Sequence, residues 1–99
     1  MNAIYVGQSA LRMRLLLGID IIGAQEVLIK YTKPSGETGE WNAEVESDSE
    51  GIIYYDLLEP SDLDEAGDWV FWGSVQFEDG RIAPSRAIVV MVRTEGIPF

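Results

Sequence analysis

The chain has 99 residues, of which 46% are hydrophobic and 24% charged, and it contains neither histidine nor cysteine. This length predicts a single domain over residues 1–99, and the missing residue types exclude disulfides, Cys/His zinc sites, Ser–His–Asp triads and cysteine nucleophiles. The net charge of −10 disfavours binding to nucleic acid or to anionic membranes, which both favour clustered Lys and Arg.

The first predicted elements are two strands. Residues 3–6 form a short apolar segment, and residues 8–17 alternate, with Leu11, Met13 and Leu15 on one face and arginines on the other. Alternation with a period of two indicates a strand that is buried on one face. No apolar run is long enough to cross a bilayer, and the N-terminus lacks the pattern of a signal peptide. We therefore expect a soluble chain that is neither exported nor inserted into a membrane.

Three further strands follow, separated by turn sequences. Residues 26–32 alternate again and lead into Lys33-Pro34-Ser35-Gly36, in which Pro fixes one φ angle and Gly supplies a positive one. Residues 41–46 alternate as well and predict a half-buried strand. The polar stretch 47–51 is a turn by composition, and residues 52–58 form the fifth predicted strand.

The C-terminal half contains the clearest strand signal. Residues 60–67 form a loop with room for one helical turn that Ser61 would cap. Five residues of the next strand, 69–77, share one face: Trp69, Phe71, Gly73, Val75 and Phe77. An Asp-Gly hairpin turn then leads into the last strand, 81–93, in which Pro84 marks a bulge or an edge position.

Seven short strands without a competing helical period predict an all-β fold. We expect an immunoglobulin-like β-sandwich of about seven antiparallel strands in two sheets. An up-and-down or partly open barrel is the structural alternative. In the sandwich, Trp69 enters the core where its strand begins, and its indole N–H can reach a backbone carbonyl.

Three segments, in this order and spacing, are similar to motifs of a known family. They are Val27-Leu28-Ile29-Lys30-Tyr31-Thr32-Lys33-Pro34-Ser35-Gly36 followed by Glu40-Trp41-Asn42-Ala43, then Leu63-Asp64-Glu65-Ala66-Gly67-Asp68-Trp69, then Val75-Gln76-Phe77-Glu78-Asp79-Gly80-Arg81. Together they resemble the small immunoglobulin-like domains of tailed-phage virion proteins, including those at the N-terminus of baseplate proteins.

This resemblance implies a non-enzymatic structural or assembly protein of a phage or prophage, as a tail, baseplate, neck or head accessory. It implies partners among other virion proteins, or a homo-oligomer, and a location in the virion and in the host cytoplasm during assembly. It brings no catalytic residues and no cofactor. The absence of histidine and cysteine agrees, because proton transfer near neutral pH would rest on carboxylates, lysine or tyrosine alone.

The predicted contact surface is an apolar strip on the outside of one sheet. If Trp69 and its same-face neighbours point inward, then Val70 and Trp72 point outward, as does Leu28 on a neighbouring strand. The last strand is apolar on both faces, so either Ile88, Val90 and Val92 or Val89 and Met91 point outward. The predicted interface comprises Leu28, Val70, Trp72, Ile88 and Val90. Alternatively, the tail Ile97-Pro98-Phe99 covers this face.

Acidic and aromatic residues give further candidates. One possible acidic edge for a partner of opposite charge comprises Glu37, Glu40, Glu44, Glu46, Asp48 and Glu50. The loop acids Asp62, Asp64, Glu65 and Asp68 lack the spacing of an EF-hand, so we expect a solvated loop rather than a cation site. The alternative function is a carbohydrate-binding or adhesion module that stacks a sugar on Tyr54, Trp41 or Trp72.

Overall fold

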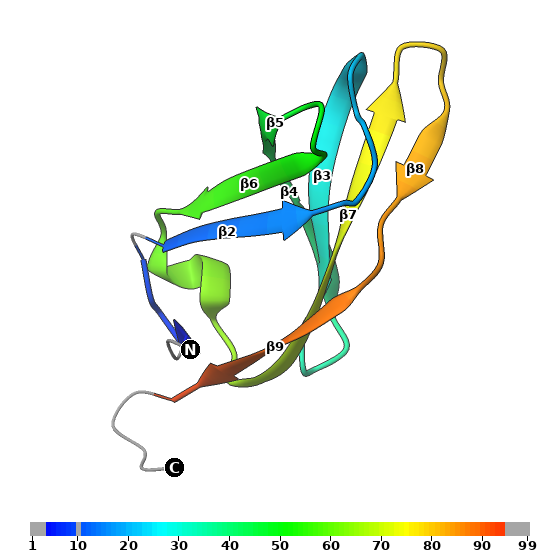
Figure 1. Cartoon of the computed structure of the whole chain (residues 1–99). Helices are drawn as coiled ribbons and strands as arrows, with labels where there is room; N and C mark the ends of the chain where they lie inside the picture. The colour runs from blue at the N-terminus through cyan, green and yellow to red at the C-terminus, as the bar shows by residue number, and fades with distance from the viewer. Residues whose placement is uncertain (1–3, 10, 95–99) are drawn as a thin grey trace.

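The computed structural model describes residues 4–9 and 11–94, which form nine strands and one 3₁₀ turn in two sheets (Figure 1). The strands are β1 (Ile4–Tyr5), β2 (Leu11–Leu16), β3 (Ala24–Thr32), β4 (Thr38–Asn42), β5 (Glu44–Ser47), β6 (Ile52–Leu57), β7 (Gly67–Phe77), β8 (Ile82–Pro84) and β9 (Ile88–Arg93), with the turn η1 (Pro60–Leu63) after β6. The larger sheet has the order β1-β9-β7-β3-β4, with β8 also beside β7, and the smaller sheet has the order β2-β6-β5. The expected all-β fold with two sheets is confirmed.

The inner faces of the two sheets enclose one hydrophobic core. The alternation predicted for residues 69–77 is confirmed, because the residues predicted to share the inner face are buried, except for Phe77, which is half-buried. Both sheets contribute side chains without exposed surface, among them Ile29, Ile53, Leu57, Trp69, Phe71 and Val75. Burying a side chain of this size contributes about 1.5–3 kcal/mol relative to leaving it exposed.

Aromatic rings connect the two sheets within this core. Trp41 of β4 stacks on Tyr55 of β6, with 4.7 Å between the ring centroids. Tyr31 of β3 lies 5.0 Å from Trp41 on the same measure. A Cβ at Gly39 would lie 2.3 Å from the Tyr31 hydroxyl. The Tyr31 ring can therefore take this position only because residue 39 has no side chain.

Two of the sequence motifs contact each other at one end of the sandwich. The Trp69 indole N–H donates to the Glu65 carbonyl at 2.9 Å, which confirms the predicted bond. The Glu65 carboxylate accepts from the backbone N–H and the hydroxyl of Ser35, at 3.1 and 3.0 Å. Lys33 donates to the Asp64 carboxylate at 3.0 Å. The turn after β3 and the loop before β7 are therefore one structural unit.

Two of the seven predicted strands are divided, so the strand count differs from the prediction. The predicted fourth strand becomes β4 and β5, which belong to different sheets because the chain crosses between them at Ala43. The predicted seventh strand becomes β8 and β9, which separate after Pro84. At this break the Ser85 N–H donates to the Gly73 carbonyl, and the Ser85 hydroxyl oxygen accepts from the Gly73 N–H. The β1–β9 pair is parallel, so the pairing is not antiparallel throughout. The predicted helical turn is present as η1, with Glu59 rather than Ser61 at its N-cap.

Candidate functional site

The outer face of the larger sheet carries three of the five residues of the predicted interface. Val70 and Trp72 of β7 are half-buried there, and Lys30 of β3 lies opposite Trp72. Leu28 lies on the same face, opposite Ser74, but only 8% of it is exposed. Leu28 therefore has the predicted orientation but offers little surface to a partner.

The pairing of β9 corrects the orientation of the other two residues. Ile88 and Val90 lie opposite the inward-facing aromatic residues of β7, so both are on the core side of the sheet. Val89 and Met91 point outward instead and are 65% and 52% exposed. The sequence left both alternatives open because β9 is apolar on both faces, and only its register with β7 decides between them.

Four apolar side chains therefore form a row on the outer face, which we call the outer strip: Val70, Trp72, Val89 and Met91. Val89 lies directly opposite Val70 across the β7–β9 pair, so the two strands present a continuous apolar surface. The tail Ile97-Pro98-Phe99, the alternative cover for this face, lies outside the described residues.

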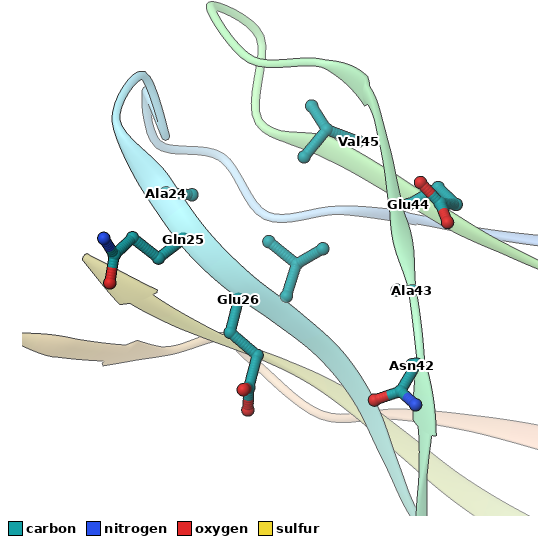
Figure 2. A pocket seen from close by; sticks show the side chains of 8 residues that line it. Ala24, Gln25, Glu26, Asn42, Ala43, Glu44 and Val45 are labelled. Carbon is teal, nitrogen blue, oxygen red and sulfur yellow. The ribbon is translucent and has the colours of Figure 1, made fainter. Parts of the chain in front are cut away.

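The second candidate is a slot between the edges of the two sheets (Figure 2). β4 pairs with β3 only as far as Leu28, and the last backbone bond runs from the Ala43 N–H to the Val27 carbonyl at 3.0 Å. After Ala43 the chain enters β5 of the smaller sheet, so the first residues of β3, from Ala24 to Val27, have no further β4 residues beside them. The slot that opens between them has a volume of about 280 Å³.

The slot is lined by both polar and apolar residues, with an acidic residue at each rim. It is lined by Ala24, Gln25, Glu26, Val27, Asn42, Ala43, Glu44 and Val45. Figure 2 shows Glu26 and Glu44 pointing to opposite sides, with Val45 turned toward the gap. Within the described residues, no ion pair joins either glutamate to a basic side chain. Sequence reasoning missed this slot, although it had grouped Glu44 with an acidic edge.

Two of the three proposed sugar platforms do not present a free ring. Trp41 is 7% exposed and stacks on Tyr55 inside the core. The Arg12 guanidinium lies 3.9 Å from the centroid of the Tyr54 ring and covers one of its faces. Trp72, the third proposed platform, is half-buried, and no ring or cation–π contact to it is present within the described residues.

Arginines of β2 neutralise carboxylates on the outer face of the smaller sheet. Arg12 donates two hydrogen bonds to Asp56, at 2.7 and 3.1 Å, and Arg14 donates to Glu46 at 2.9 Å. These bonds hold the pKa values of Asp56 and Glu46 below their ordinary range. Glu46, one member of the predicted acidic edge, is therefore already paired within the chain.

The acidic loop before β7 serves the fold. Asp64 holds Lys33 by a hydrogen bond that raises the pKa of the lysine, and Glu65 holds Ser35. No group of three or more acidic side chains in the described part of the chain is arranged to hold a metal ion. Two of the four loop acids, Asp64 and Glu65, are thus engaged in contacts within the chain.

Comparison with known proteins identifies the fold. No protein-family model matches the chain, and no curated protein matches its sequence. The structure is similar to that of CopC from Methylosinus trichosporium OB3b, with a TM-score of 0.60 and 18% sequence identity, over 98% of this chain and 89% of that chain. The chain has the fold of CopC. The described residues contain no helix with the length and hydrophobicity needed to span a membrane.

The match to CopC overturns the resemblance to phage virion proteins. The assignments drawn from that resemblance are therefore wrong: a phage tail, baseplate, neck or head protein, located in the virion or in the host cytoplasm. The reason lies in the motifs themselves. The turn at Lys33 and the loop at Glu65 brace each other, and the Asp79-Gly80 turn closes a hairpin. Such features build a sandwich and do not distinguish one family of sandwiches from another.

Proposed function

We propose that the chain is a non-catalytic protein that associates with a second copy of itself through the outer strip. The observation that carries the proposal is the row of apolar side chains across β7 and β9, in which Val89 and Met91 are more than half exposed. Contiguous exposed apolar surface on a folded protein usually marks an interface. Trp72 supports this use, because Trp is enriched among the residues that contribute most to binding.

The distribution of charge favours a second copy as the occupant. By strand register, the outer face of the larger sheet carries Lys30 and Arg93 beside Glu26, Glu40 and Asp68, so its charges nearly balance. The whole chain has a net charge of −10, so almost all of the excess lies on other surfaces. A twofold axis brings identical faces together, and like-charge repulsion is weakest where the net charge is smallest.

An immunoglobulin-like sandwich is the finer description of the fold that we favour. Trp69 lies near the start of β7, the central strand of the larger sheet, and its indole N–H donates to the backbone carbonyl of Glu65, much as the hydroxyl of a tyrosine corner bonds the backbone. The parallel pairing of β1 with β9 is a departure from that arrangement at one edge of the larger sheet.

The likeness to CopC raises the question of whether this chain can hold a copper ion, and its residues do not fit one. Copper sites use imidazole, thiolate or thioether ligands, and the sequence has no histidine, no cysteine and three methionines. Met13 is buried in the smaller sheet, whereas Met91 lies on the outer face of the larger one. Met1 lies outside the described residues. We therefore base the proposed function on the outer strip and not on a metal.

The mass of the protein in solution tests the proposal. Native mass spectrometry and light scattering are expected to give two copies of the 11.0 kDa chain. The double variant Val89→Lys and Met91→Lys is expected to weaken association at least tenfold, because it places charges in the strip while both side chains are already exposed.

A matched control uses two other exposed apolar residues. Leu16 and Leu58 are 72% and 71% exposed and lie outside the larger sheet. The double variant Leu16→Lys and Leu58→Lys is expected to keep the mass of two copies. A wild-type protein that stays a single copy at high concentration, or a control that dissociates as fully as the strip variant, would contradict the proposal.

A further inference from the structure

Two strand edges face the slot without a strand partner in residues 4–9 and 11–94. β3 pairs with β7 along one side, but at 24–27 its other side has only the bond from Ala43 to Val27. β5 pairs with β6 along one side alone. Such an edge presents N–H and C=O groups to which an extended peptide can add as a further strand. The slot volume of about 280 Å³ is below the range of roughly 300–1,000 Å³ typical of small-molecule sites.

The lining of the slot determines which side chains an added strand would carry. Val45 faces the interior of the slot, and 41% of it remains exposed. Glu26 is on the outer face of the larger sheet and Glu44 on the outer face of the smaller one, so each stands at one rim. Successive side chains of a strand point to opposite sides. A strand that places an apolar side chain over Val45 therefore places the next one outward, between the two carboxylates.

The charges favour a basic segment of another protein over a second copy of this chain. β2 carries two basic residues in alternation, but Arg12 is bonded to Asp56 and Arg14 to Glu46. A second copy would have to break both pairs to bring these arginines to the slot. Acidic side chains on an edge strand also repel an identical acidic edge, so the same glutamates that discourage self-pairing select a basic partner.

We infer that the slot binds an extended segment of a partner protein in which apolar and basic residues alternate. The segment pairs its backbone with the free edge of β5, buries its apolar side chains against Val45 and Val27, and directs its basic side chains to Glu26 and Glu44. This inference does not rest on association through the outer strip, which uses different residues.

The probe for this inference is an eight-residue peptide of alternating valine and lysine, titrated into the ¹⁵N-labelled full chain. Amide signals of 24–27 and 44–47 are expected to shift, whereas a valine–glutamate peptide of the same length produces no shift. N-methylation of every second backbone nitrogen blocks one edge of a strand only. The peptide methylated at its valines and the peptide methylated at its lysines are therefore expected to differ in affinity for the chain: one loses binding and the other keeps it.

Paired variants separate the slot from general attraction to an acidic protein. Replacing Glu26 and Glu44 by glutamine is expected to weaken binding at least tenfold. Replacing Glu37 and Glu40 by glutamine removes the same charge from positions outside the slot lining, and a change below threefold is expected.

Three results of the binding titrations would overturn the inference: no binding of the valine–lysine peptide, equal losses in the two variant pairs, or equal binding of both N-methylated peptides. Amide shifts confined to 70–72 and 89–91 would also overturn it, because they would locate the peptide on the outer strip.

Discussion

At the scale of single residues, ion pairs on the smaller sheet link the stability of the fold to pH. Arg14 lowers the pKa of Glu46 by a side-chain hydrogen bond, and Arg12 does the same for Asp56. A carboxyl whose pKa is lower in the folded state stabilises the fold above its unfolded pKa, and that contribution disappears as the pH falls through the folded pKa. These side chains are at the surface, so each contribution is small.

The double variant Glu46→Gln and Asp56→Asn is accordingly expected to lose less stability on acidification than the wild type. The difference should develop below about pH 4.3, the ordinary pKa of glutamate. Urea unfolding followed by circular dichroism at a series of pH values from 6 to 2 measures it. Equal slopes for the two proteins would show that these pairs do not shift the carboxyl pKa values.

Single residues also show what the sequence can reveal. The burial of Trp69 and the bond of its indole N–H followed from its place in an alternating strand and from the need of a buried donor for a partner. The roles of Glu65 and Ser35 did not follow, because their contact joins positions thirty residues apart. That contact exists only once β3 and β7 have paired.

At the scale of elements, alternation predicted a strand whenever one of its faces was polar. β7 could be oriented from its own sequence, whereas β9 could not, because all residues from Ile88 to Val92 are apolar. The division into β4 and β5 was also hidden. Apolar residues alternate with polar ones through Trp41, Ala43 and Val45 even though the chain changes sheets there. The sequence pattern therefore does not reveal that the strand is divided. The slot depends on that crossing and was therefore missed.

The turn between β5 and β6 gives a prediction at this scale. Gly51 has a φ of +71°, and a Cβ there would lie 1.9 Å from the backbone oxygen of Ile19, whereas at Gly18, with a φ of +76°, a Cβ would meet nothing within 4 Å. Gly18→Ala is expected to cost about 1–2 kcal/mol of unfolding free energy from the left-handed backbone alone. Gly51→Ala is expected to cost at least about 1 kcal/mol more, because the backbone at Ile19 must move. Thermal unfolding of the two variants compares these losses of stability. Equal losses would mean that the backbone at Ile19 moves away from the new Cβ without a cost in free energy.

At the scale of the whole molecule, the sequence predicted the two-sheet class but misjudged the relationship to other proteins. Turns and corners such as Lys33–Gly36 are needed by many sandwiches, so their order matched a family to which the comparison of structures gives no support. The extent of the domain, residues 1–99, stays a prediction. Only the register between β7 and β9 shows that their outward-facing apolar side chains lie side by side. This arrangement is the basis of the proposed self-association.

Acrylamide quenching of tryptophan fluorescence over a range of protein concentrations tests this self-association most directly. Trp41 and Trp69 are 7% and 0% exposed, so both are shielded whether or not the chain associates, and Trp72 is the partly exposed tryptophan that reports on the outer strip. We predict that the quenchable fraction falls as the concentration rises, in step with the change from one copy to two, and that Trp72→Phe abolishes the change. Quenching of Trp72 that is the same at every concentration would contradict the account.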